Sequence, residues 1–239
     1  MPQPIPARSS AAELRALTAE VIRMGGLAEA QVVDAVDAVV RRDVPLAQGL
    51  IVRDLRLDAM QADIERRAMA LIAGEALEGE DLRRAVSAFK LAMNLERCGD
   101  LARNTAKRSM VLSESAPVLP LMSALARMGR LVAGRLREVL DAYAAQEMEA
   151  ALTVWRRDDE VDEHYESLWR ELLTLMAEEP EAVATGAHLL FIAKNLERIG
   201  DHATNIAEIL HFQMTGEELD QPRPKVSLIE AGPPRDGAT

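Results

Sequence analysis

Residues 195–205 read NLERIGDHATN, and a close variant of this segment, NLERCGDLARN, occupies residues 94–104. Between positions 94 and 106, nine of thirteen residues are identical to those found 101 positions later. Agreement of this kind indicates an internal duplication. Positions four apart on an α-helix differ by only about 40° around its axis. In a helix, Glu197, Asp201 and Asn205 would therefore form one stripe of oxygen-bearing side chains.

The duplication extends well upstream of this segment. With an offset of 104, the Arg-Met-Gly sequence of residues 23–25 recurs at residues 127–129. The repeating unit is therefore about a hundred residues long, and the chain holds two of these units in tandem. The predicted repeats span residues 10–113 and 116–216, and the remaining residues, 1–9 and 217–239, are expected to be flexible tails.

The composition is typical of a helical protein. Hydrophobic residues make up 49% of the chain but aromatic residues only 3%, so the core is expected to consist of Leu, Ala, Val, Ile and Met. Seven of the eleven prolines lie in the predicted tails. The other four mark helix starts or the turns just before them, since proline is tolerated in the first turn of a helix and disruptive later. No stretch alternates as a strand would. We expect an all-α fold of two tandem three-helix bundles, with helices near residues 10–42, 45–75, 81–112, 117–145, 149–177 and 180–216.

The charge and the cysteine content exclude some classes of protein. A formal net charge of −11 and a pI near 5.0 argue against nucleic-acid binding, which usually requires a basic surface. The single cysteine, Cys98, excludes an intrachain disulfide and a thiolate metal cage, and it fits a reducing cytoplasm. No apolar run approaches the length of a membrane span. We therefore expect a soluble, cytoplasmic protein.

Acidic pairs four residues apart lie on the helix that precedes each duplicated segment. In an antiparallel hairpin, Asp54 and Asp58 would face the acidic residues of that segment, and the pair recurs 104 positions later. A single pair of this kind is more simply read as a solvated helix face. Four pairs in register favour metal binding, because clustered carboxylates repel one another unless they are solvated, protonated or neutralised by cations. The predicted metal-binding residues are Asp54, Asp58, Glu96, Asp100 and Asn104 in the first repeat and Asp158, Asp162, Glu197, Asp201 and Asn205 in the second, the two asparagines flanking the carboxylates.

Other residues of the duplicated segment are read differently. His202 has no counterpart in the first copy, so we interpret it as a packed residue and leave it out of the metal set. Arg97 and Arg198 could be surface residues or could orient a carboxylate, and the sequence does not choose between these roles. Gly99 and Gly200 lie inside predicted helices, where glycine costs about 1 kcal/mol relative to alanine. Their presence indicates close approach of another helix beside the motif.

The doubled motif resembles that of the PhoU family of phosphate-uptake regulators. The resemblance covers residues 10–215 and is carried by the Glu-Arg-x-Gly-Asp pattern at residues 96–100 and 197–201, and by Asp-Leu-Arg at residues 81–83. Two departures touch no proposed ligand. Cys98 stands where the family usually has isoleucine, and residues 77–80 lack the proline that is common before Asp-Leu-Arg.

The resemblance also implies a function. PhoU proteins are cytosolic, membrane-associated accessory proteins that act with the Pst phosphate transporter and the PhoR sensor kinase, and they repress phosphate-starvation genes when phosphate is plentiful. The family implies bound iron, zinc, manganese or magnesium held by Glu/Asp-x-x-x-Asp motifs. The residue types add their own constraint, because oxygen ligands favour hard cations such as Mg²⁺, Mn²⁺ or Ca²⁺, while ferric iron also accepts them. The oligomeric state, a homodimer included, stays open.

Two other classes of function compete with a regulatory adaptor. A di-metal carboxylate oxidoreductase would need Glu-x-x-His pairs, and the residues three after Glu96 and Glu197 are glycines. The remaining alternative is a helical bundle that stores metal or has no site at all. The sequence contains no nucleophile–base constellation and no glycine-rich phosphate loop, so we expect a protein that is not an enzyme.

Overall fold

A computed structural model describes residues 7–74, 77–114, 119–220 and 223. The regular structure of these residues is entirely helical and contains no strand. No helix within these ranges is long and apolar enough to cross a lipid bilayer. The elements are α1 (Ala7–Arg41), α2 (Val44–Gly74), α3 (Gly79–Leu112), α4 (Leu119–Ala145), α5 (Met148–Arg156), α6 (Asp159–Glu178), the short 3-10 helix η1 (Pro180–Ala182) and α7 (Val183–Thr215).

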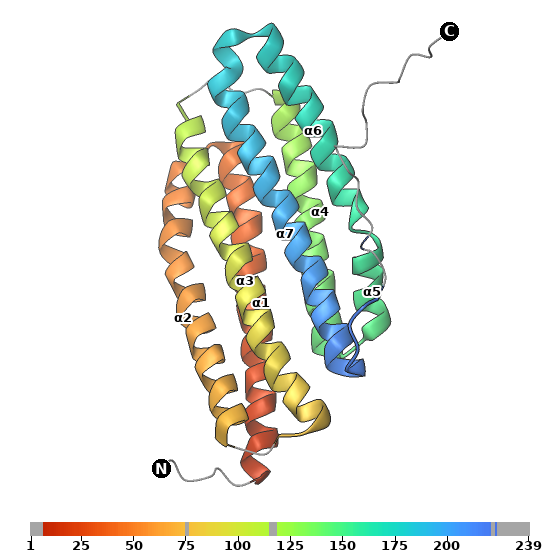
Figure 1. Cartoon of the computed structure of the whole chain (residues 1–239). Coiled ribbons are helices and arrows are strands. Elements are labelled where there is room, and N and C mark those ends of the chain that lie inside the picture. The colour runs from red at the N-terminus through yellow and green to blue at the C-terminus, as the bar shows by residue number, and fades with distance from the viewer. Residues whose placement is uncertain (1–6, 75–76, 115–118, 221–222, 224–239) are drawn as a thin grey trace, which may run out of the picture.

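The helices form two units that lie side by side, α1–α3 and α4–α7, and the middle helix of the second unit is divided into α5 and α6. Figure 1 shows α2 on one flank of the molecule and α5 and α6 on the other, with α1, α3, α4 and α7 between them. The halves meet where α1 packs on α4 and α3 packs on α7. Their buried leucine, alanine, valine and isoleucine side chains belong to one continuous core. The predicted all-α fold of two tandem three-helix repeats is confirmed, with both repeats sharing that core.

Two glycines at equivalent repeat positions form the contact between α1 and α4. A Cβ atom added to Gly25 would lie 2.5 Å from Leu140 Cδ2, and one added to Gly129 would lie 2.5 Å from Val36 Cγ2. Gly25 and Gly129 are 104 residues apart, and so are Val36 and Leu140. The contact is therefore self-complementary, as in a two-fold symmetric dimer interface, with each unit offering a glycine to the other's branched side chain.

The helix boundaries follow the prolines closely. Pro45 lies in the first turn of α2, and Pro180 begins η1. Pro120 lies in the first turn of α4, whereas Pro117 falls outside the described residues. At the start of the chain, α1 begins at Ala7, three residues before residue 10, where the first helix was expected to begin.

One predicted element was wrong. The expected helix over residues 149–177 is interrupted, because α5 ends at Arg156 and α6 begins at Asp159. Arg157 leaves helical geometry, with φ −108° and ψ 23°. The interruption leaves Asp158 buried at the start of α6, where its carboxylate accepts a hydrogen bond from Thr204 on α7. This tertiary contact is not visible in the local sequence, and the equivalent stretch of α2 is continuous.

Candidate metal centre

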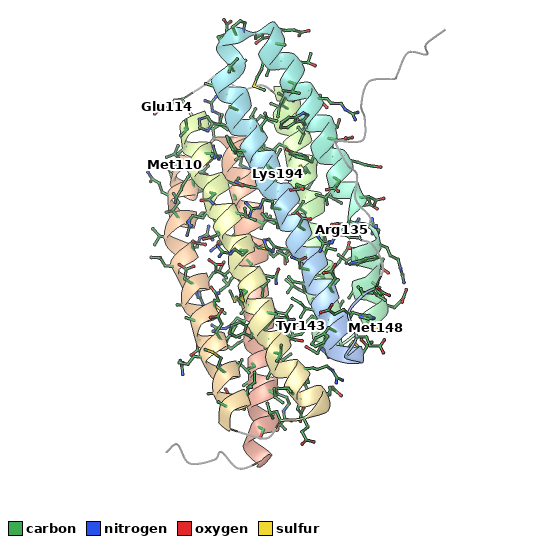
Figure 2. The ribbon with its side chains drawn as sticks, in the orientation of Figure 1. Met110, Glu114, Arg135, Tyr143, Met148 and Lys194 are labelled. Carbon is green, nitrogen blue, oxygen red and sulfur yellow. The ribbon has the colours of Figure 1, made fainter. Side chains whose placement is uncertain are left out.

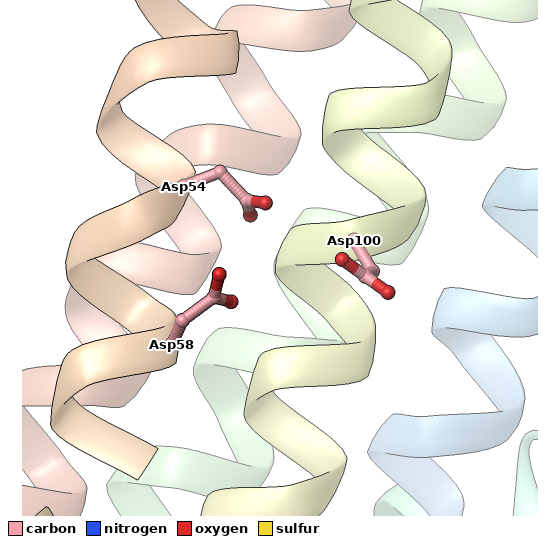
Figure 3. Close-up of side chains that lie close together, drawn as sticks. All are labelled: Asp54, Asp58 and Asp100. Atoms are coloured by element: carbon pink, nitrogen blue, oxygen red, sulfur yellow. The ribbon is translucent and has the colours of Figure 1, made fainter. Parts of the chain in front are cut away.

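The first carboxylate cluster lies between α2 and α3. Asp54 and Asp58 project from α2 toward α3, which carries Asp100 (Figure 3). One carboxylate oxygen from each of these three residues lies within 4.8 Å of the other two. Because α2 and α3 run antiparallel, the pair spaced by four on one helix meets the motif residue on the other. The predicted convergence of Asp54, Asp58 and Asp100 is therefore present.

The other two residues predicted for this cluster, Glu96 and Asn104, lie outside the tight group of three aspartates. Glu96 lies one turn before Asp100, and burial, followed by the charges of Asp100, Asp58 and Asp54, raises the pKa of its carboxyl group; Arg97 opposes this rise. Glu96 is thus within the electrostatic reach of the cluster, although its oxygens are not part of the tight group. Asn104 is exposed at the edge of α3.

An arginine that the sequence analysis did not single out lies in the cluster. The Arg103 guanidinium donates through Nη1 to Asp54 Oδ2, and its Nη2 lies 2.8 Å from Asp100 Oδ1. Its side chain is 25% exposed, whereas that of Asp54 is 1% exposed. A guanidinium bridging two carboxylates neutralises part of their charge. The sequence did contain a signal for this contact, because Arg103 stands three positions after Asp100, a spacing that places two side chains next to each other on a helix.

The remaining oxygens of this cluster fit a hard cation. Asp54 Oδ1 is buried and has no hydrogen-bond partner among the described residues, and Gln31 Oε1 is in the same condition. Both oxygens lie beside Gly99, where an added Cβ atom would be 3.1 Å from Asp54 Oδ1 and 3.3 Å from Gln31 Oε1. The close helix approach predicted at Gly99 is confirmed, since its missing side chain makes room for Leu57. Three convergent aspartates with an unsatisfied buried oxygen are the donors that Mg²⁺ or Mn²⁺ would take.

Burial raises the pKa of Asp54 above its ordinary value, Arg103 opposes the rise, and Asp58 and Asp100 add to it. A carboxyl group whose pKa is higher in the folded state stabilises the fold below its unfolded pKa and loses that contribution as pH rises through its folded pKa. The metal-free protein should therefore lose stability from about pH 4 towards neutrality. We expect Asp54→Asn to flatten this decline, measured by urea unfolding with chelator present.

The control for this prediction is Asp63→Asn on the same helix, where the side chain is 38% exposed and paired with arginines. This variant should keep the slope of stability against pH found in the parent protein. An unchanged slope in the Asp54→Asn variant would show that the buried carboxyl group of the first cluster does not control the pH dependence.

The second cluster also has a buried aspartate at its centre, Asp158, but fewer converging oxygens. Asp158 Oδ1 accepts a hydrogen bond from Thr204 Oγ1 at 2.7 Å, while Asp158 Oδ2 is buried without a hydrogen-bond partner among the described residues. Burial raises the pKa of Asp158, and Asp201 and Asp162 raise it further, while Thr204 and Arg223 oppose them. Within the described ranges, no three carboxylates of this repeat approach one another as closely as those of the first cluster.

Arg223 forms ion pairs with acidic residues of the second cluster. Its Nη1 lies 3.2 Å from Asp201 Oδ1, and its Nε lies 3.8 Å from Asp158 Oδ2. The same guanidinium donates to Asn205 Oδ1 and to Glu208 Oε1. The residues after 216 had been expected to form a flexible tail, but Arg223 contacts Asp158 and residues of α7, and Glu217 bonds His211 and Thr215 at the end of α7. No motif surrounds Arg223, so sequence reasoning had no means of finding this contact.

Two residues predicted for the second site have other partners. Glu197 is buried, and Lys194 Nζ lies 2.7 Å from its Oε2, although no described residue meets this oxygen with hydrogen-bond geometry. Lys194, labelled on α7 in Figure 2, also lies over the ring of Tyr165. We read the pair as an ion pair, since the short distance joins opposite charges. Asn205 donates at 3.3 Å to Asn94 Oδ1, which links the two repeats.

The remaining residues of the duplicated motif, His202, Arg97 and Arg198, have different surroundings. His202 Nδ1 lies 2.9 Å from Asn94 Oδ1, and burial lowers the pKa of this histidine. It is therefore a packed residue, as predicted, and the structure places it between the repeats. Arg97 lies 3.3 Å from Asp100 Oδ2 and 3.6 Å from Glu96 Oε2, whereas Arg198 is exposed and pairs with no described residue. The two equivalent arginines therefore take the two roles that the sequence left open.

Comparison with known proteins agrees with the fold and with the doubled motif. The family model described as "PhoU domain" matches residues 21–109 and 125–210. A protein of Caulobacter vibrioides (strain NA1000 / CB15N), named phosphate-specific transport system accessory protein PhoU homolog, is 54% identical over 93% of this chain and 96% of its own length. A protein of the same name from Rhizobium meliloti (strain 1021) is 44% identical over 89% of this chain and 90% of its own length.

Two solved structures have the same fold. The crystal structure of PhoU from Pseudomonas aeruginosa superposes with a TM-score of 0.83 at 35% identity, covering 86% of this chain and 99% of that one. The crystal structure of the phosphate transport system regulatory protein PhoU from Streptococcus pneumoniae gives a TM-score of 0.82 at 28% identity, covering 89% of this chain and 100% of that one.

Proposed function

Because the chain belongs to the PhoU family, we propose that it is a regulatory adaptor of phosphate uptake. It acts in the cytoplasm through contact with a Pst phosphate transporter and a PhoR-like sensor kinase, and it represses phosphate-starvation signalling when phosphate is plentiful. The observation that carries this proposal is the 54% identity, over 93% of the chain, to a protein named as an accessory protein of the phosphate-specific transport system.

The proposal includes metal binding by the two carboxylate clusters. Asp54, Asp58 and Asp100 would hold one ion, and Asp158, Asp162 and Asp201 are the candidates for the other. The oxygen-only donors favour Mg²⁺ or Mn²⁺, with iron accepted and zinc less suited. A bound divalent cation would supply positive charge to a face that is otherwise acidic, and a partner's carboxylate or phosphate group could then dock there.

Several observations support an adaptor rather than an enzyme. Cys98 is fully buried, and burial raises the pKa of its thiol to about 12, which leaves it without a reactive thiolate. His202 is bonded to an asparagine rather than to a nucleophile. The tight cluster within the described residues consists of three aspartates and contains no histidine, unlike the di-iron sites of oxidoreductase bundles. The similar proteins are named as accessory or regulatory proteins.

Deletion of the gene in its host tests the proposed function. We expect a phosphate-starvation reporter to become active in high phosphate, because the repressing adaptor is missing. Wild-type protein should restore repression. The Asp58→Ala/Asp100→Ala variant should fail to restore it at equal abundance, since the metal-bearing face is lost.

The matched control is Asp63→Ala/Glu65→Ala, which removes two acidic residues from α2 outside the cluster. This variant should restore repression as fully as the wild type. A reporter that stays silent in the deletion strain, with no paralogue present, would contradict the phosphate assignment. A cluster variant that restores full repression would separate the adaptor role from the carboxylates.

A further inference from the structure

The two repeats supply the guanidinium of their acidic cluster in different ways. In the first repeat, Arg103 on α3 bridges Asp54 and Asp100. The residue 101 positions after Arg103 is Thr204, so the second repeat has no arginine at the equivalent place on α7. Thr204 instead donates its hydroxyl to Asp158. A neutral hydroxyl leaves the carboxylate charge of this cluster uncompensated.

Arg223 fills this gap from a different part of the chain. Its guanidinium approaches Asp158 and Asp201, which are the repeat equivalents of Asp54 and Asp100. The arginine thus lies between the equivalents of the two carboxylates that Arg103 bridges in the first repeat, although it follows the end of α7. Its side chain is 19% exposed, comparable with 25% for Arg103. The second cluster therefore has a guanidinium beside it, as the first cluster does, although the two arginines stand at different positions of the repeat.

The contacts around Arg223 are those of a built guanidinium site. Nη1 lies 3.2 Å from Asp201 Oδ1, and Nη2 lies 3.2 Å from Glu208 Oε1 and donates to Asn205 Oδ1. Glu208 is fixed in turn by the indole nitrogen of Trp155, at 3.0 Å. Asp158 is more than nine-tenths buried, and its Oδ2 has no hydrogen-bond partner in the part of the chain that the structure describes; this oxygen lies 3.8 Å from Arg223 Nε. A planar, multiply donating cation matches these acceptors, and a spherical ammonium group would match them less well.

We propose that the second carboxylate cluster is a guanidinium-binding site, filled by Arg223 of the same chain, and that a divalent cation enters it only as this guanidinium leaves. Arg103 is anchored on a helix that packs in the centre of the molecule, whereas Arg223 lies beyond the last turn of α7, which ends at Thr215. The second site is therefore the one from which the arginine is exchangeable. The entry of a cation into this site rests on the metal binding proposed above, whereas the binding of a guanidinium does not.

The exchange follows from competition for the same oxygen atoms. A cation held at about 2.0–2.6 Å by Asp158 and Asp201 would use the Asp201 oxygen to which Arg223 donates and the Asp158 oxygen that lies 3.8 Å from Arg223 Nε. Thr204 already occupies Asp158 Oδ1, so a cation and Arg223 would compete for Asp158 Oδ2 and would repel each other there. In the first cluster, Arg103 bonds Asp54 Oδ2 and leaves Oδ1 for a cation. Metal loading of the second cluster would consequently release Arg223, and with it the constraint on the chain at that point.

Chemical replacement of the arginine tests the guanidinium site without any metal. In the Arg223→Ala protein with chelator present, added ethylguanidinium should shift the amide NMR signals of residues around Asp158 and Asp201. Ethylammonium, which has equal charge but no planar fork, should bind about tenfold more weakly. The wild-type protein should respond to neither probe, because Arg223 already fills the site.

A second variant guards against a nonspecific response. Adding Asp201→Asn to Arg223→Ala should abolish the ethylguanidinium shifts, since one of the two bridged carboxylates is lost. Equal responses to the two probes, or equal responses of the wild type and Arg223→Ala, would overturn the proposal and leave only an acidic surface that attracts cations.

The cation step is measured separately with Mn²⁺ alone. Calorimetry should show that Arg223→Ala raises the affinity of the second cluster about tenfold, the equivalent of one lost competing ion pair. Arg156→Ala, which removes a paired arginine of α5 that is 53% exposed, should leave the affinity unchanged. Unchanged affinity in Arg223→Ala overturns the exchange. Absence of Mn²⁺ binding in every variant would instead sink the proposed metal role, and the ethylguanidinium result would still decide the guanidinium site.

Discussion

The Asp58→Ala/Asp100→Ala protein should bind Mn²⁺ at its first cluster on the order of a hundredfold more weakly than the wild type, or not at all, because affinity at oxygen sites rises with the number of charged ligands. Its stability without metal should fall little, since the substitutions also remove repulsion among three carboxylates that lie within 4.8 Å. Arg103 retains Asp54 as a partner. Calorimetric titration of chelator-stripped protein measures the first effect, and urea unfolding measures the second.

The control for net charge is again Asp63→Ala/Glu65→Ala, with both positions on α2 and outside the cluster. If this variant loses Mn²⁺ affinity to the same degree, the effect reflects long-range charge and the ligand assignment is wrong. A large loss of metal-free stability in the cluster variant alone would contradict the idea that its carboxylates are held for function rather than for folding.

Gly129→Ala should destabilise the protein by about 1–3 kcal/mol, the usual cost of overpacking a close contact. The added Cβ atom would lie 2.5 Å from Val36 Cγ2, 2.8 Å from Cγ1 and 3.1 Å from Cβ. Valine is branched next to the backbone and has few rotamers in a helix, so α1 and α4 must move apart. Thermal unfolding should show a midpoint lowered by roughly 2–4 °C for each kcal/mol.

Two further glycines serve as comparisons on the same helices. Gly25→Ala meets the flexible end of Leu140 and should cost less than Gly129→Ala, although its closest distance is the same 2.5 Å. Gly134→Ala meets nothing within 4 Å and should stabilise α4 by about 0.5–1 kcal/mol, because alanine favours the helix. If all three substitutions had the same effect, helix propensity rather than the contact between repeats would set the result.

The sequence alone predicted the helical class, the internal repeat and the helix face that the members of each acidic pair share. Helical periodicity is local, so positions such as Asp54 and Asp58 share a face wherever their helix packs. Proline excludes itself from helix interiors, which is why Pro45 and Pro180 placed two boundaries correctly. Glycine inside a helix is costly without a reason, and Gly99 and Gly200 do lie against other helices, at Leu57 and Val161.

The tertiary structure decided which charges meet. A long arginine side chain reaches whichever acid its packing brings near, so Arg97 pairs with Asp100 while the equivalent Arg198 is exposed. Lys194 took Glu197 out of the expected ligand group for the same reason. Helical spacing gives the face on which a side chain lies, but the partner across from it depends on helix rotation and on neighbours distant in sequence.

The break between α5 and α6 and the position of Arg223 have the same origin. The energy that holds Asp158 inward comes from Thr204 on another helix, and no local propensity reports it. Arg223 comes from a segment whose sequence predicts no structure, yet it forms ion pairs with two carboxylates of the second cluster. The sequence by itself therefore determined the helical class, most helix boundaries and which acidic residues share a helix face. Only the folded chain determined that each cluster holds a guanidinium, because these ion pairs join residues that come together through packing alone.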